Sequence, residues 1–280
     1  MPLHMTGDLV ASAREHGVGV GAFNVITLEY AEAIAAGAES AGAPVILQVS
    51  QNAVRFHLGR VEPIGAACRA VAAAAGVPVA LHLDHVDDEE LYRQAADAGF
   101  SSAMFDASRL DYAANVAATR AAASWAHTHG LWLEAELGEV GGKEGVHAPT
   151  ARTDPDEAAS FVAHTGVDAL AVAVGSSHAM TTQTARLDFE LVGRLRGAVP
   201  VPLVLHGSSG VPDADLTRAV QAGIVKVNIA THLNKVFTDA VRAYLADHPT
   251  VVDTRKYLAP GREAVAREVA RLIGTVLTAD

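Results

Sequence analysis

Residues 79–85 read Val-Ala-Leu-His-Leu-Asp-His, an apolar run that ends in polar side chains. Other apolar runs end in a similar way: Leu-Trp-Leu-Glu-Ala-Glu-Leu-Gly (131–138), Ala-Val-Ala-Val-Gly-Ser-Ser-His (171–178) and Leu-Val-Leu-His-Gly-Ser-Ser-Gly (203–210). Such runs are typical of buried parallel strands, whose carboxyl ends open into the loops above a sheet. We therefore expect the histidines and carboxylates at these ends to meet in space and to form a metal site.

The alternation of apolar and amphipathic stretches predicts a (β/α)8 TIM barrel, because eight strands alternate with eight helices. The expected strands are 18–23, 45–49, 79–83, 102–105, 131–137, 169–174, 203–205 and 225–227. The expected helices are 27–41, 61–75, 87–98, 110–129, 154–165, 187–197, 212–222 and 232–247. An extra C-terminal helix at 260–277 is expected to pack outside the barrel or against a neighbouring subunit. We expect residues 1–280 to form a single domain.

A doubly wound open sheet would show the same alternation of strands and helices. It normally carries a glycine-rich phosphate turn after its first strand, where this chain has Phe23-Asn24-Val25. The barrel is therefore the favoured fold.

Composition limits the classes of protein and partner. Hydrophobic residues make up 50% of the chain and aromatic residues 5%, so we expect Val, Leu, Ile and Ala to fill the interior. The net charge of -11 argues against nucleic acid as a partner. Cys68 is the single cysteine, which excludes an intramolecular disulfide. The sequence has no signal-peptide pattern and no apolar run of the ~20 residues that span a bilayer, so we expect a cytoplasmic protein with no membrane partner.

Histidines at predicted strand ends are the candidate metal ligands, namely His85, His178 and His206. Neutral imidazole is a favoured zinc ligand near pH 7. Asp84, next to His85, is a candidate to orient a ligand or to carry a proton. Asp106 ends another predicted strand and is a candidate to support a ligand histidine from behind.

Glu134 and Glu136 are two residues apart on a predicted strand and therefore share a face. A buried carboxylate costs free energy unless it is paired or bound to metal, so each either binds the metal or forms a salt bridge to a Lys or Arg inside the barrel. Glu136 lies nearer the mouth and is the better ligand candidate. The glycine-rich stretch 138–145 predicts either a loop that closes over a ligand and brings Glu144 to the site, or a solvated loop.

Two segments are candidates to bind an anion, because they follow the last two predicted strands, where this kind of barrel usually binds phosphate. Gly207-Ser208-Ser209-Gly210 precedes a helix, and its amides and hydroxyls suit a phosphate, although the same sequence is common in plain turns. Residues 226–231 read Lys-Val-Asn-Ile-Ala-Thr. Lys226 lies within a predicted strand, so we expect it to face a ligand or a carboxylate.

Four motifs in this order and spacing carry a resemblance: Leu-His-Leu-Asp-His, Glu-Ala-Glu-Leu-Gly, His-Gly-Ser-Ser-Gly-Val-Pro and Lys-Val-Asn-Ile-Ala-Thr. Over nearly the whole chain, the sequence resembles class II ketose-bisphosphate aldolases, the zinc-dependent fructose- and tagatose-bisphosphate aldolases. The resemblance implies Zn2+ as cofactor, with an additional monovalent cation as an option, and a phosphorylated sugar as substrate. It implies reversible retro-aldol cleavage of a ketose 1,6-bisphosphate to dihydroxyacetone phosphate and an aldehyde, a role in glycolysis, and a homodimer or homotetramer.

The resemblance also implies roles for individual residues. The implied zinc ligands are His85, His178 and His206, with Glu136 in or beside the ligand shell. Asp84 would be the acid/base at the C4 hydroxyl, and Glu144 a mobile-loop carboxylate linked to proton exchange at C3. Together with the anion-binding segments, the candidate substrate and phosphate contacts are Asn24, Ser50, Ala179, Gly207, Ser209, Lys226, Asn228, Thr231 and Arg255. Arg255 matches an arginine that often reaches the distal phosphate from a neighbouring subunit.

Three departures from the family pattern bear on the substrate. Ala179 stands where Gly usually follows the zinc histidine, and a left-handed backbone there would cost Ala ~1–2 kcal/mol. A lysine that the family often has is absent from 180–183. Ala230 replaces the Asp of the fructose-specific branch, as in tagatose-type relatives. The sugar therefore stays open between fructose, tagatose and another sugar phosphate.

Two other classes are weighed against an aldolase. A metal-dependent barrel hydrolase usually has His-x-His at the end of its first strand, where this chain has Phe-Asn-Val. A non-catalytic subunit of an aldolase complex would be favoured by loss of Asp84 or of a zinc histidine, and none is lost.

Overall fold

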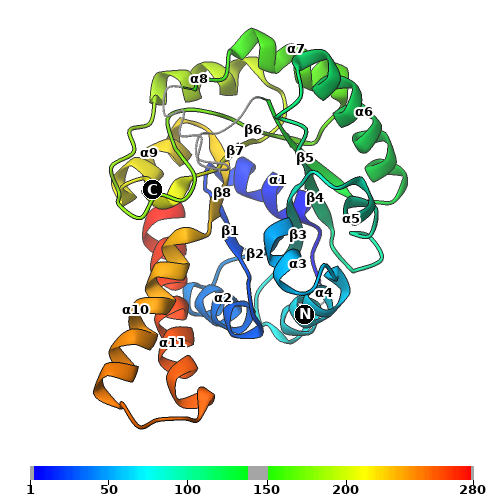
Figure 1. Ribbon diagram of the computed structural model, residues 1–280. Coiled ribbons are helices and arrows are strands. Elements are labelled where there is room, and N and C mark those ends of the chain that lie inside the picture. Colours follow the sequence, from blue (N-terminus) through cyan, green and yellow to red (C-terminus); the bar gives the residue numbers. More distant parts are fainter. Residues whose placement is uncertain (1–2, 138–150, 279–280) are drawn as a thin grey trace.

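The computed structural model describes residues 3–137 and 151–278, and it confirms the predicted TIM barrel. Eight parallel strands close in chain order, each pairing with the next and β1 with β8, and helices surround them (Figure 1). The strands are β1 (Val20–Asn24), β2 (Val45–Ser50), β3 (Val79–Val86), β4 (Ser102–Phe105), β5 (Trp132–Glu136), β6 (Ala169–Ala171), β7 (Leu203–Leu205) and β8 (Ile224–Ile229).

Most helices lie where the sequence predicts them. The helices between and after the strands are α2 (Leu28–Ala41), α3 (Gln51–Phe56), α4 (Val61–Ala74), α5 (Glu89–Arg93), α6 (Tyr112–Thr128), α7 (Pro155–Thr165), α8 (Phe189–Ala198), α9 (Asp213–Ala222) and α10 (Thr231–Asp247). Aspartate side chains cap several helix starts by accepting backbone N–H groups, at Asp88, Asp111, Asp154 and Asp188. The helix expected at 87–98 is regular only over α5, because the chain then continues in turns closed by short-range bonds such as Ala95 N–H to Tyr92 O.

Helix α1 (Thr6–His16), which the sequence analysis did not predict, closes the amino end of the barrel. Leu9, Val10 and Ala13 of α1 pack in one apolar cluster with residues at the starts of strands, among them Val20 and Ile46. The carboxyl ends of the strands are therefore the open mouth, where ligands bind in this fold.

The C-terminal helix α11 (Thr254–Leu272) packs on the outside of the barrel, against α2, which was one of the two predicted places. It begins six residues before the predicted start at 260 and passes into a π-helical turn over Ile273–Leu277. A Cβ at Gly37 would lie 2.5 Å from the carbonyl oxygen of Ala266, so glycine allows the close approach of α2 and α11. Helices α10 and α11 run side by side and project beyond the barrel (Figure 1).

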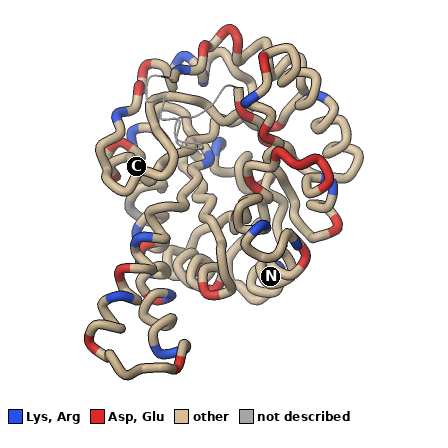
Figure 2. The backbone as a smooth tube through the Cα atoms, in the orientation of Figure 1, with Lys and Arg blue, Asp and Glu red and all other residues tan. Residues whose placement is uncertain are grey.

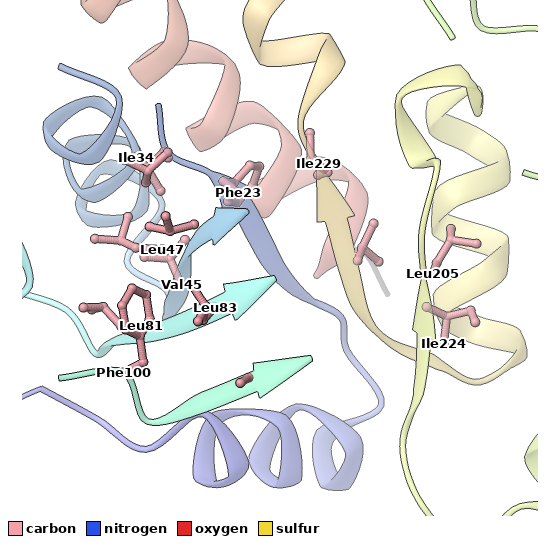
Figure 3. Packing of buried hydrophobic residues seen from close by; sticks show 14 of the residues in the cluster. Phe23, Ile34, Val45, Leu47, Leu81, Leu83, Phe100, Leu205, Ile224 and Ile229 are labelled. Carbon is pink, nitrogen blue, oxygen red and sulfur yellow. The ribbon is translucent and has the colours of Figure 1, made fainter. Parts of the chain in front are cut away.

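Apolar side chains on the outer faces of the strands pack under the surrounding helices. In Figure 3, Phe23, Leu47 and Leu81 extend from β1, β2 and β3, and Ile34 of α2 lies over them. Most charged residues lie on the helices and loops around the barrel (Figure 2). Among the described residues, no helix combines the length and apolar character that crossing a membrane requires.

Val, Leu, Ile and Ala make up most of the buried core, as expected, but the middle of the barrel also holds polar side chains. Gln48, His82, Ser102, Glu134 and Lys226 are buried there. Lys226 Nζ lies 2.8 Å from Glu134 Oε2, and because β8 and β5 are not neighbours, this contact crosses the interior. The polar layer is tolerated because its members form ion pairs and hydrogen bonds with one another, such as His82 Nδ1 with Ser102 Oγ at 2.8 Å.

Candidate active site

A cavity of about 320 Å³ opens at the carboxyl ends of the strands. Most of the residues predicted from the sequence to contact substrate line it: Asn24, Ser50, Ala179, Gly207, Ser209, Asn228 and Thr231. Asp84, His85, Asp106 and His178 line it as well. Strand ends that lie far apart in the sequence therefore meet at one mouth, as the barrel topology requires.

The three candidate ligand histidines come together. One ring nitrogen from each of His85, His178 and His206 lies within 4.8 Å of the other two. His85 reaches the mouth beside Asp84 because β3 is irregular at its end. The pairing register shifts between Leu83 and Val86, and His85 has a left-handed backbone with φ 49°.

Carboxylates behind two of the histidines fix the ring orientation. Asp106 Oδ2 lies 2.9 Å from His85 Nδ1, and Glu134 Oε1 lies 2.8 Å from His206 Nε2. A carboxylate can only accept, so these ring nitrogens donate, and the opposite nitrogen of each ring is left to act as a ligand. His85 Nε2 is buried and has no hydrogen-bond partner in the part of the chain that the structure describes.

Glu136 lies beside this histidine group. Its Oε2 is 3.4 Å from His206 Nδ1, and it also forms a possible ligand group with His85 and Asp106. Burial alone would lower the pKa of His206, but the hydrogen bond to Glu134 and the nearby carboxylate of Glu136 outweigh burial and raise the pKa to about 9. Burial alone would raise the pKa of Glu134, but Lys226 and His206 lower that pKa well below its usual range.

The donor set fits a zinc ion. Three imidazole nitrogens converge from β3 and from the segments after β6 and β7, and Glu136 lies within reach. His85 and His178 also line the cavity, so a zinc ion held by them would be accessible to substrate, as catalytic zinc sites require. The orphaned His85 Nε2 has no other evident role among the described residues.

Asp84 is placed next to this group, at the end of β3. Its side chain is buried and lines the cavity. Asn228 Nδ2 lies 3.5 Å from Asp84 Oδ1, so the amide faces this carboxylate. A buried carboxylate at the mouth of the pocket is suited to proton transfer with a bound substrate.

The loop after β7 and the start of α10 form a polar cradle. Gly207 has φ 66°, and a Cβ there would lie 2.6 Å from the carbonyl carbon of Ser177, so only glycine fits. The Ser209 hydroxyl accepts the backbone N–H of His232 in the first turn of α10. Backbone amides at such a helix start suit a phosphate.

The comparison with known protein families decides the identity. The family Fructose-bisphosphate aldolase class-II matches residues 4–280. The chain belongs to the class II fructose-bisphosphate aldolases. It is therefore an aldolase, an enzyme that cleaves and forms a carbon–carbon bond in phosphorylated sugars.

Solved structures of similar proteins agree with this assignment. The YdjI aldolase from Escherichia coli K12 is 34% identical over 100% of both chains, with a TM-score of 0.84. The fructose-bisphosphate aldolase from Campylobacter jejuni is 23% identical, covers 98% of this chain and 95% of its own, and has a TM-score of 0.83. At 23% identity, the similarity to the second structure supports the fold alone.

Two of the predicted site residues of this aldolase lie elsewhere, and a third is not among the described residues. Lys226 does not line the cavity, because its amine is fully buried beneath it and contacts Glu134. Arg255 lies at the start of α11, where it pairs with Asp253 at 2.9 Å and is 89% exposed, so it does not line the cavity of its own chain. Glu144 lies outside the described residues.

Polar residues that no sequence motif marked also line the outer side of the cavity, notably Asn52, Arg55, Asp87 and Arg109. Arg55 lies on α3, directly after β2, and its guanidinium is 3.8 Å from Asp87. All four lie in segments that directly follow predicted strands at the mouth. This position was the available signal, since residues that connect strands to the next helices build the active sites of TIM barrels.

Ala179 has the strained backbone that its position in the family motif predicts, with φ 58°. We expect Ala179→Gly to raise the free energy of unfolding of this aldolase by about 0.5–1 kcal/mol. Relief of ~1–2 kcal/mol of left-handed strain exceeds the ~0.4–1 kcal/mol that a glycine costs through the unfolded chain. The measurement is the urea midpoint at unchanged m-value.

Ala185→Gly is the matched control for this substitution. Ala185 lies in the same segment, is buried, and is not among the residues with positive φ. The Ala185→Gly variant should therefore have a lower free energy of unfolding. Equal destabilisation by both substitutions would contradict the assignment of strain to Ala179.

Proposed function

We propose that this aldolase cleaves the C3–C4 bond of a ketose 1,6-bisphosphate of fructose or tagatose type, with a zinc ion held by His85, His178 and His206. The products are dihydroxyacetone phosphate and an aldehyde. The observation that carries the proposal is the convergence of the three histidines within 4.8 Å, beside the buried carboxylate of Asp84. The single domain, the homodimer or homotetramer, the cytoplasmic location and the role in glycolysis stay predictions.

The residues divide the reaction between them. A zinc ion held there would supply Lewis-acid stabilisation of the negative charge that develops at C3 and on the C2 oxygen of the substrate. Asp84 takes the proton of the C4 hydroxyl as the C3–C4 bond breaks and returns it in the reverse direction. The Gly207–Ser209 loop and the start of α10 hold the phosphate of the dihydroxyacetone half, which positions the sugar.

The other half of the sugar faces the outer wall of the cavity. Arg55 and Arg109 line this wall, and Arg255 does not. Guanidinium groups bind phosphate and carboxylate oxygens well. We therefore propose that the aldehyde half carries an anionic group and that Arg55 contacts it from within the same chain.

A panel assay tests the proposed function. Purified protein of known metal content is offered fructose 1,6-bisphosphate, tagatose 1,6-bisphosphate and the two corresponding 1-phosphates, and release of dihydroxyacetone phosphate is measured. Release from a bisphosphate by zinc-containing protein supports the proposal. No release from any sugar, or release by metal-free protein that borohydride inactivates, would overturn it.

Arg55→Met is expected to raise KM for the bisphosphate about 10-fold, at the lower end of the about 1.5–3 kcal/mol that one charge-assisted hydrogen bond contributes, because this side chain is exposed. The KM for the 1-phosphate should change little, because that sugar lacks the second anion. Arg242→Met on α10, which removes an exposed arginine paired with Asp239, is the control. An equal rise in KM for both sugars would place Arg55 outside the subsite.

A further inference from the structure

We propose that Lys226, buried beneath the cavity, is a positioning residue that fixes the direction of two pocket carboxamides, Asn24 and Asn228, so that both present N–H donors to the substrate. The inference rests on the proposed function and names how the site recognises the oxygens of a phosphorylated sugar. Lys226 lies on β8 and is fully buried. None of the reaction steps described above uses it.

The amine of Lys226 has three oxygen partners. Its Nζ lies 2.8 Å from Glu134 Oε2, 2.7 Å from Asn228 Oδ1 and 3.1 Å from Gln48 Oε1. An ammonium group has three protons and no acceptor. Each partner therefore has to turn an oxygen toward Lys226.

This requirement fixes the direction of Asn228. Because the amide oxygen of Asn228 faces Lys226, the amide nitrogen faces the opposite way, toward Asp84 Oδ1 at 3.5 Å. The two ends of an amide are of similar size, so contacts that only accept or only donate decide the orientation. With Lys226 on one side and the Asp84 carboxylate on the other, only one orientation of the Asn228 amide is favourable.

A second chain of hydrogen bonds fixes Asn24 in the same way. The oxygen of Gln48 accepts from Lys226, so the nitrogen of Gln48 donates to Asn24 Oδ1 at 3.0 Å. The amide nitrogen of Asn24 is then left to point elsewhere, and Asn24 lines the cavity. One buried amine thus sets two donors on the pocket wall, where oxygens of an anionic substrate need donors.

The same amine also supports the carboxylate behind His206. Glu134 forms an ion pair with Lys226 through Oε2 and accepts a hydrogen bond from His206 through Oε1. Removal of Lys226 alone would leave Glu134 buried beside His206 without its cation, which threatens folding. The test therefore needs a background in which this carboxylate is neutral.

The experiment is a double-mutant cycle of Lys226→Met and Asn228→Ala, built in the Glu134→Gln background. Zinc-loaded protein is titrated with dihydroxyacetone phosphate by calorimetry, and zinc content and melting temperature are measured for each variant. We expect Asn228→Ala to weaken binding about 10-fold and Lys226→Met to weaken it at least as much, because Asn24 is affected as well. The pair should weaken binding little more than Lys226→Met alone, because Lys226 acts on Asn228 through the amide. Lys235→Met, which removes an exposed lysine on α10, is the control and should bind normally.

A purely structural lysine would give a different pattern. Losses that multiply to about 100-fold in the pair, or a loss for Lys226→Met that follows only the melting temperature or the zinc content, would overturn the inference. Failure of the proposed function is a separate outcome, because the unsubstituted protein would then release no dihydroxyacetone phosphate from any ketose phosphate.

Discussion

Removal of the metal with a chelator is expected to lower the rate of C–C cleavage by at least ~10³-fold, and added zinc is expected to restore it. The negative charge left on the substrate when the C3–C4 bond breaks needs several kcal/mol of stabilisation, and about 1.4 kcal/mol corresponds to a tenfold change in rate. Among the described residues, the lysine nearest the site is Lys226, whose amine is buried and engaged by Glu134, so it is not placed to form a Schiff base with a sugar.

His178→Ala and His164→Ala form a matched pair for this prediction. His178 belongs to the histidine group, whereas His164 is an exposed histidine on α7. The first variant should lose zinc and turnover together, and the second should keep both. Full turnover by chelator-treated protein that elemental analysis finds free of metal would contradict the proposed mechanism.

The part of the site that could be predicted from the sequence is the part set by topology. In a parallel barrel every strand carries its carboxyl end to the same mouth, so the positions of His85 and His206 relative to their strands were enough to bring them together. Local backbone detail was not needed for that conclusion. The shift of register and the left-handed φ of 49° at His85 explain how both Asp84 and His85 face the mouth, but no sequence pattern identified them beforehand.

Depth along a strand was harder to predict than position around the barrel. Lys226 and Asn228 are two residues apart on β8 and point to the same side, yet Asn228 lines the cavity and Lys226 lies one layer below it. The stagger of neighbouring strands sets which layer reaches the cavity, and a single sequence does not specify that stagger. The sequence correctly indicated a carboxylate partner for Lys226 as one option, and Glu134 is that partner.

Arg255 shows a different limit. Its motif indicated phosphate binding, but the residue lies on the projecting pair of helices α10 and α11, away from the cavity of its own chain. A sequence motif does not show whether its residue contacts substrate in its own chain or in a neighbouring subunit. Arg55 was missed for the opposite reason, because no motif marks it, although it lies in the short helix directly after β2.

Asp84→Asn is expected to lower the turnover of the zinc-loaded aldolase by ~10²–10⁴-fold, the range typical for loss of a general acid/base. The substitution keeps the size of the side chain and an oxygen that can accept from Asn228 Nδ2, so substrate binding and zinc content should stay within a few-fold of the unsubstituted protein. The loss should therefore appear in kcat and not in KM.

Hydrogen exchange at C3 separates an acid/base role of Asp84 from a general disturbance of the site. Exchange of hydrogen between dihydroxyacetone phosphate and heavy water does not involve the C4 hydroxyl. The Asp84→Asn variant should therefore catalyse this exchange within about 10-fold of the normal rate. Cleavage should be lost, because only cleavage needs this general acid/base. The control is Asp8→Asn, which changes an exposed aspartate on α1 at the closed end of the barrel and should leave both rates unchanged.

Near-normal cleavage by Asp84→Asn would remove the acid/base role from Asp84. Parallel loss of cleavage and exchange would instead assign Asp84 to holding the metal or the dihydroxyacetone half of the substrate.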